Sequence, residues 1–137
     1  MDFELVKILG DFGLLILTWI VQLVVYPGFL FYNEIDLKKW HGPYTYRITF
    51  VVMPLMLIQL FVYSRSLFLN LSTYNGIMLG LVLITWIITF LLAIPLHNDL
   101  DRLSNTIDQR KKLISVHWMR TGVWTIIFII SLLNYAS

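Results

Sequence analysis

The sequence predicts an all-α fold: a bundle of four transmembrane helices that run up-down-up-down in a single domain covering residues 1–137. Composition is the first reason, because 58% of the 137 residues are hydrophobic and 13% are charged, whereas soluble domains average about 25% charged residues. The second reason is that the apolar residues fall into four runs, each near the roughly 20 residues that a helix needs to cross a bilayer. The net charge of +2 gives no support for nucleic-acid binding, and the absence of cysteine excludes disulfides and thiolate chemistry.

The first and third runs define two spans directly. Residues 12–32 and 76–96 contain no lysine, arginine, aspartate or glutamate. We therefore expect the first span at about residues 10–32 and the third at about residues 75–97. Prolines lie inside the first three spans, where each removes a backbone hydrogen bond and predicts a kink. These prolines are Pro27, Pro54 and Pro95.

The second run is too short to cross a bilayer unless it includes a basic residue. The charge-free stretch between Arg47 and Arg65 falls short of a span. The second helix is therefore expected at about residues 44–63, directly after Gly42-Pro43, because proline at the first helical position loses no hydrogen bond. This assignment places Arg47 inside the bilayer.

The fourth run gives the same result. Few residues follow Arg120 before the last residue of the sequence, so the fourth span is expected at about residues 114–134. His117 and Arg120 then lie one or two turns inside the bilayer, where a charge needs a partner.

Basic residues set the expected orientation. Eight of the 10 lysines and arginines belong to the first and third loops or their helix borders, whereas Lys7 and Arg65 lie on the opposite side. Loops rich in lysine and arginine stay in the cytoplasm. We therefore expect both termini on the non-cytoplasmic side of a multi-pass protein of the cell membrane, of the kind found in the bacterial inner membrane.

Polar residues at the cytoplasmic end share helix faces. The first helix places three of them at i, i+3 and i+7, and the fourth helix repeats the arrangement, so each group lies on one face. An up-down bundle brings these helix ends together, which predicts one polar pocket near the cytoplasmic interface. The candidate catalytic residues are His97, His117 and Arg120, and the candidate ligand-binding residues are Trp19, Gln22, Tyr26, Arg47, Asn98, Thr121 and Trp124.

Each of these residues also has a simpler interpretation. An arginine near a helix end can extend to lipid headgroups, and Gln22 can hold two helices together. The chain has no pair of metal ligands at i, i+3 or i, i+4 of a helix. We therefore predict no metal and no cofactor, with convergence of the histidines on a metal or haem as the alternative.

Four segments of the chain resemble small four-helix membrane proteins of the anthrone-oxygenase-like group. They are TWIVQLVVYPGF, WHGPYTYRI, PLHNDL and LISVHWMRTGVWT, of which Pro95 to Asn98 and Trp118 to Arg120 match best. The resemblance implies insertion of oxygen into an activated polyketide without metal or flavin, through a carbanion that reacts with dioxygen. By that resemblance, His97 or His117 would be the base, and Arg120 or Arg47 would stabilise the enolate.

The leading hypothesis is a small membrane protein with a pocket for a hydrophobic, anionic small molecule, in which an oxygenase-like reaction would take place. The alternative is a non-catalytic membrane subunit or lipid-binding protein, with membrane lipids, a protein partner or a second copy packed against it. A small transporter ranks third, because Asp11 is the sole acid near the outer half of the predicted spans.

Overall fold

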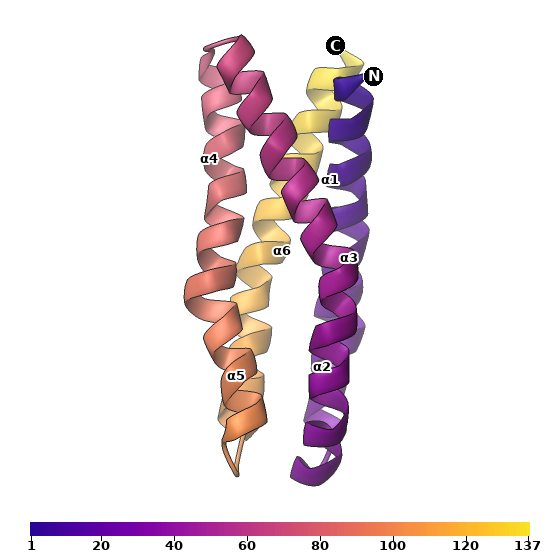
Figure 1. Cartoon of the computed structure of the whole chain (residues 1–137), viewed down its shortest axis with the longest axis vertical. Coiled ribbons are helices and arrows are strands. Elements are labelled where there is room, and N and C mark those ends of the chain that lie inside the picture. Colours follow the sequence, from indigo (N-terminus) through magenta and orange to yellow (C-terminus); the bar gives the residue numbers. More distant parts are fainter.

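The computed structural model describes residues 1–137 and consists of four continuous helical rods joined by three short turns (Figure 1). The first rod contains a π-helical turn and ends in a short 3-10 segment, and the third rod contains a second π-helical turn. The elements are α1 (Phe3–Ile20), η1 (Val21–Val25), α2 (Tyr26–Gly28), η2 (Phe29–Phe31), α3 (Glu34–Leu69), α4 (Thr73–Ile88), η3 (Thr89–Ala93), α5 (Ile94–Arg102) and α6 (Ile107–Ala136).

Each rod is long and apolar enough to cross a membrane, which confirms the expectation of four helices of that kind. The rods contain 29 to 36 residues. At about 1.5 Å per residue the shortest is about 44 Å long, whereas the hydrocarbon core of a bilayer is about 30 Å thick. The helices are therefore long enough to extend beyond that core into the headgroup regions.

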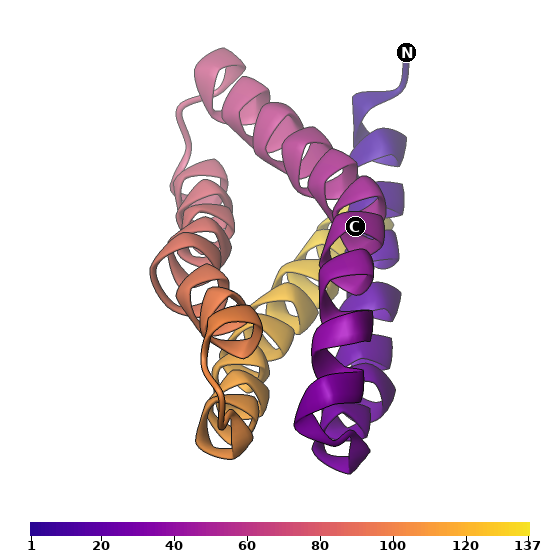
Figure 2. The same ribbon diagram turned by 60° about the horizontal axis from the view of Figure 1, so that its bottom comes forward.

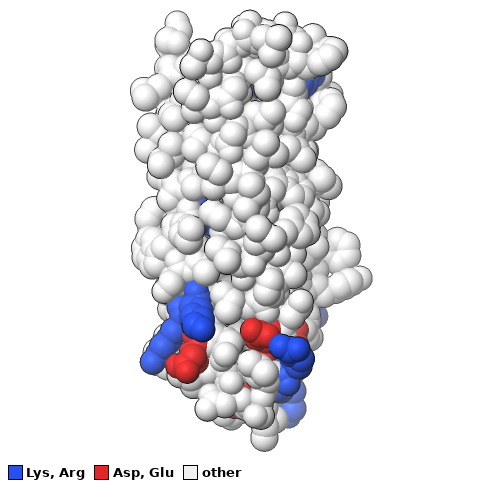
Figure 3. All heavy atoms as spheres, turned by 90° about the vertical axis from the view of Figure 1, so that its left-hand side faces the viewer, with Lys and Arg blue, Asp and Glu red and all other residues white.

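The bundle has two different ends. Both termini and the α3–α4 turn lie at one end, which we call the terminus end, and the other two turns lie at the opposite end, which we call the loop end (Figure 1). Helix α3 starts beside the first rod at the loop end and leans across to α4 at the terminus end, as Figure 2 also shows. On the face drawn in Figure 3, the charged side chains gather at the loop end.

Helix α3 begins well before the proposed start at Tyr44, so that prediction is wrong. The side chain of Asn33 caps the helix by accepting a hydrogen bond from the Asp36 N–H (2.8 Å). The negative charges of Glu34 and Asp36 in the first turn interact favourably with the positive end of the helix dipole and stabilise this helix start. These signals outweigh Pro43, which lies inside the helix.

The π-helical turns stand directly before Pro27 and Pro95. In them the Tyr26 N–H donates to the Val21 carbonyl and the Ile94 N–H to the Thr89 carbonyl, five residues back instead of four. A proline has no N–H and crowds the carbonyl four residues before it. The widened turns accommodate this at two of the three prolines for which we predicted kinks, and such turns are frequent at functional sites.

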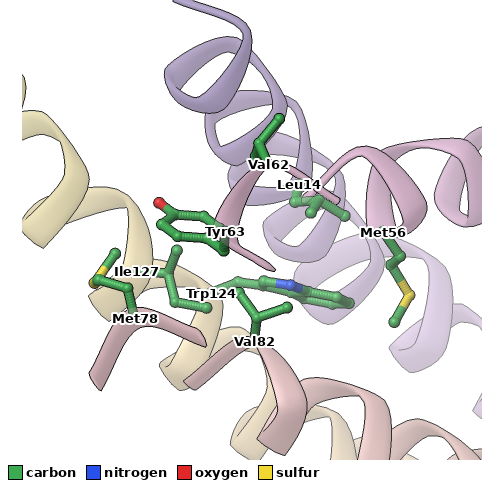
Figure 4. Close-up of a cluster of buried hydrophobic side chains, with 8 residues drawn as sticks. All are labelled: Leu14, Met56, Val62, Tyr63, Met78, Val82, Trp124 and Ile127. Atoms are coloured by element: carbon green, nitrogen blue, oxygen red, sulfur yellow. The ribbon is translucent and has the colours of Figure 1, made fainter. Parts of the chain in front are cut away.

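Two clusters of closely packed hydrophobic side chains hold the rods together. The larger one combines residues of α1, α3, α4 and α6: Leu14, Met56, Val62, Tyr63, Met78, Val82, Trp124 and Ile127 (Figure 4). The smaller one lies nearer the loop end and consists of Val21, Tyr26, Phe29, Leu37, Tyr44, Leu100 and Leu113.

A buried arginine, Arg110, links the segments at the loop end. Arg110 is 1% exposed, and its guanidinium donates to the carbonyls of Phe29 (2.9 Å) and Tyr32 (2.7 Å) and to Thr106 Oγ1 (2.9 Å). It also forms an ion pair with Glu34 at 3.0 Å. The side chain therefore joins the start of α6 to the turn between η2 and α3.

Candidate functional site

A cavity of about 240 Å³ lies between the first rod, α3, the third rod and α6. One part of its wall is polar, and the rest consists of aliphatic residues, methionines, threonines and one tryptophan. The polar wall is formed by Tyr26, Tyr44, His97, Asn98, Asp101, His117 and Arg120, and the remaining wall includes Leu17, Val21, Ile48, Val52, Met53, Met56, Ala93, Ile94 and Trp124.

Arg120 is the cation of this cavity, and no carboxylate pairs with it. The side chain is 6% exposed, and its Nε is buried without a hydrogen-bond partner. None of the five close contacts between a basic and an acidic side chain uses Arg120. Its polar neighbours are the phenols of Tyr26 and Tyr44, and its guanidinium stacks on the ring of Trp124, 4.8 Å from the centroid. A positive charge without a carboxylate partner therefore lies in the cavity wall.

His117 presents a basic nitrogen close to this charge. Its Nε2 lies 3.2 Å from the Thr18 carbonyl oxygen and 3.3 Å from Thr18 Oγ1. The carbonyl can only accept a hydrogen bond, so we assign the proton to Nε2. Nδ1 is then an unprotonated acceptor, and it is buried without a partner. His117 thus contributes a neutral ring with a free acceptor nitrogen near Arg120.

Four further residues form a continuous chain of hydrogen bonds. Tyr26 Oη lies 2.9 Å from His97 Nε2, His97 Nδ1 lies 2.8 Å from His41 Nε2, and His41 Nδ1 lies 2.7 Å from Asp101 Oδ1. The rings of His41 and His97 stack with centroids 5.0 Å apart. His41 is fully buried, whereas the Asp101 side chain is 46% exposed.

The structure brings together six of the 10 candidates from the sequence in the cavity wall: Tyr26, His97, Asn98, His117, Arg120 and Trp124. Gln22 and Thr121 lie behind the wall. Thr121 donates to Gln22 Oε1 (3.3 Å), and Gln22 Nε2 donates to the Ile114 carbonyl (3.4 Å). This matches the simpler interpretation of Gln22 as a contact between helices.

Trp19 and Arg47 lie away from the cavity, and for them the pocket assignment is corrected. The Trp19 ring N–H donates to Thr125 Oγ1 (3.1 Å), and its ring packs edge-on against Trp118. Arg47 is exposed, and its guanidinium lies 5.8 Å from the centre of the Trp40 ring. The sequence indicated how far along α3 Arg47 lies, but not which side of the helix its side chain faces.

The sequence did not place His41 and Asp101 in the predicted pocket, where they entered only through the metal alternative, and it did not single out Tyr44 and Thr18. His41 was assigned to a loop because the second helix was expected to begin after it. The available signal was the Asn33 cap with acids in the following turn, which extends the helix back through His41. His41 then faces the third rod.

No group of three or more histidine, aspartate or glutamate side chains is arranged as metal ligands. His97 illustrates the reason, since both of its ring nitrogens are engaged by Tyr26 and His41. No family model, curated protein or solved structure matches this chain. The geometry of the cavity therefore carries the functional argument.

Proposed function

We propose that this chain is an integral membrane protein whose cavity binds a small hydrophobic molecule as an anion at Arg120. The observation that carries the proposal is a buried arginine in a cavity wall without a carboxylate partner. A charge placed inside a membrane costs about 2.5–3.5 kcal/mol at the helix centre on the insertion scale. An anionic group of the ligand would compensate that cost.

The shape of the cavity supports an amphipathic ligand. Ile48, Val52 and Met56 lie one turn apart on α3 and line the apolar side, over about 12 Å at 1.5 Å per residue. The cavity volume of about 240 Å³ is below the roughly 300–1,000 Å³ of typical ligand pockets. The ligand is therefore small, or part of it extends between α3 and α5, where the lining residues Thr49 and Asn98 are exposed.

The chemistry that this wall favours is removal of an acidic proton. The unprotonated Nδ1 of His117 would act as the base, with His97 as the second candidate, and Arg120 would stabilise the developing negative charge. By the anthrone-oxygenase-like resemblance, the resulting carbanion would then react with dioxygen. The cofactor-free reaction is the most specific form of the proposal.

The orientation follows from charge. Eight of the 10 basic residues belong to the loop end or the helix segments next to it, which would place that end in the cytoplasm and both termini outside. The cavity lies towards the loop end, so it would be reached from the cytoplasmic leaflet of a cell membrane, as in the bacterial inner membrane.

The alternative is a non-catalytic lipid-binding subunit that packs against a protein partner or a second copy. The same unpaired Arg120 favours it, since a headgroup phosphate would also compensate the charge. Mass spectrometry of the gently purified protein separates the two, because a retained phospholipid supports the subunit and a retained acidic aromatic or polyketide supports the enzyme.

Binding of a defined probe tests the proposal itself. The protein in nanodiscs is titrated with 2-naphthol, whose anion absorbs at longer wavelength than the neutral form, and with 2-methoxynaphthalene, which cannot ionise. We expect the bound naphthol to be the anion, and we expect Arg120→Met to weaken its binding while leaving the ether unaffected. Arg47→Met is the matched control, because this exposed arginine lies outside the cavity. Equal binding of naphthol by both variants would refute an anion site at Arg120.

A further inference from the structure

We propose that Tyr26, His97, His41 and Asp101 form a proton relay between the cavity and the aqueous surface at the loop end. The inference rests on the proposed function and develops its second candidate base, His97, which would receive the proton of the ligand through Tyr26. The relay gives that proton a route to water.

The geometry of the relay is continuous. Its three successive contacts measure 2.9, 2.8 and 2.7 Å from the tyrosine to the aspartate, all within hydrogen-bond range. Tyr26 is 3% exposed and His41 is fully buried, whereas His97 between them is partly exposed. Asp101 borders the cavity as well, and its side chain is 46% exposed, so the outer end of the relay reaches solvent.

Proton positions follow from the outer end. A carboxylate only accepts hydrogen bonds, so His41 Nδ1 must carry a proton and donate it to Asp101. His41 Nε2 is then an acceptor and receives the Nδ1–H of His97. His97 Nε2 in turn accepts the Tyr26 O–H. All three bonds point outward, and neither ring needs a charge.

One concerted shift moves a single proton from the cavity to Asp101. The ligand gives its proton to the Tyr26 oxygen, while Tyr26 transfers its own proton to His97 Nε2. His97 transfers its Nδ1 proton to His41 Nε2, and His41 transfers its Nδ1 proton to the Asp101 carboxylate. One bond to hydrogen breaks and one forms at each of the three inner residues, which stay neutral. The ligand ends as the anion beside Arg120, and Asp101 ends as the acid.

The step also defines how the relay is reset. After the transfer both histidines carry their protons on Nε2, so the hydrogen bonds point inward. Asp101 releases its proton to water, and the rings must turn over, or a proton must return inward, before a second transfer. The relay therefore handles one proton for each ligand that is ionised.

The rate at which bound 2-naphthol loses its proton distinguishes a proton relay from a purely structural role of these four residues. The protein in nanodiscs is mixed with 2-naphthol at neutral pH, where the free naphthol is protonated, and anion formation is followed by absorbance in a stopped-flow instrument. We expect Asp101→Asn and His41→Ala to slow anion formation by roughly 100-fold, the range in which a general acid or base contributes. Free imidazole should restore the rate in His41→Ala, since it can occupy the vacated position.

The matched control is Asp99→Asn, on the same helix. Asp99 pairs with Arg102 at 2.9 Å and does not contact the relay. The Asp99→Asn variant should therefore form the naphthol anion at the wild-type rate. If Asp101→Asn and His41→Ala also do so, the relay is wrong even though the anion site stands.

A measurement without ligand keeps the two proposals separable. Nitrogen NMR of the protein labelled with ¹⁵N-histidine reports the tautomer of each ring. We expect both His41 and His97 to carry the proton on Nδ1, with His117 on Nε2. Unlike tautomers at His41 and His97 would break the chain and overturn the relay, whether or not naphthol binds. Failure of naphthol to bind, with both rings as expected, would overturn the proposed function and with it the transfer of a ligand proton along the relay.

Discussion

Two arginines of α6 lie in opposite chemical situations. Arg110 and Arg120 are 1% and 6% exposed, although the sequence predicted burial for Arg120 alone and assigned Arg110 to the third loop. Arg110 has an ion pair with Glu34 and three hydrogen bonds, whereas the Nε of Arg120 has no partner and no carboxylate pairs with its guanidinium. Burial of a charge is therefore no evidence of a site by itself. A charge that the protein leaves uncompensated in a cavity is such evidence.

The terminus end contains a buried acidic side chain that, like Arg110, has its partners within the protein. Asp11 is 1% exposed and accepts hydrogen bonds from Gln59 Nε2 (2.7 Å) and Tyr63 Oη (2.6 Å), one on each carboxylate oxygen. It does not line the cavity that contains Arg120. We interpret Asp11 as a structural group that ties α1 to α3.

The largest expected effect is on stability, from Arg110→Met. Glu34 would keep Lys38 and Thr106 as partners, and its side chain is 30% exposed. The carbonyls of Phe29 and Tyr32 would lose their donor, and at about 1–3 kcal/mol for each acceptor left without a partner the loss is about 2–6 kcal/mol. The free energy of unfolding, measured by denaturation from mixed micelles, should fall by that amount, and the exposed neighbour Lys111→Met should leave it unchanged. A loss below about 1 kcal/mol would remove the contrast between the two arginines.

Arg120→Met should have the reverse profile. We expect binding of the 2-naphthol anion to weaken by about 2–5 kcal/mol, as for a buried charge pair that loses one member. The unfolding free energy should stay the same or rise, because an unpaired buried charge has been replaced by an apolar chain of similar length. Calorimetric titration and the same denaturation assay measure the two quantities. A large loss of stability would show that Arg120 is compensated within the protein.

Asp11→Ala should cost less and should leave the cavity unaffected. Two buried donors would lose their acceptor, which corresponds to about 1–3 kcal/mol of unfolding free energy. A double-mutant cycle with Tyr63→Phe isolates one bond, and we expect a coupling energy of about 0.6 kcal/mol, the average for hydrogen bonds between membrane helices. Altered binding of 2-naphthol in Asp11→Ala would contradict the separation of the two ends.

The smallest effect is expected from Arg47→Met. The guanidinium is exposed and lies over the Trp40 ring, so its loss should change the unfolding free energy by no more than about 0.5 kcal/mol. Binding of 2-naphthol should be unchanged. Weakened binding would show that Arg47 belongs to the ligand site, as predicted from the sequence.

From the sequence, the depth of a residue in the bundle was predicted better than the side of the helix that it faces. Run lengths placed His117 and Arg120 inside the bundle, and both line the cavity. Arg47 was placed at a similar depth by the same argument, yet it faces outward, because run length says nothing about rotation around a helix axis. The partner of His97 was also missed. Pro43 was interpreted as a helix start, whereas capping by Asn33 begins the helix earlier and brings His41 against His97.

The two π-helical turns let each rod hold one extra residue without changing which way the cavity side chains face. A π-helical turn holds about one residue more than an α-helical turn for the same full rotation. Loss of one residue from Val21–Val25 would therefore restore an α-helical turn and leave Tyr26 facing in nearly the same direction relative to α1, and a loss from Thr89–Ala93 would do the same for His97 relative to α4. What such a loss would change is the space before Pro27 and Pro95, so related sequences that keep these prolines should also keep the extra residue.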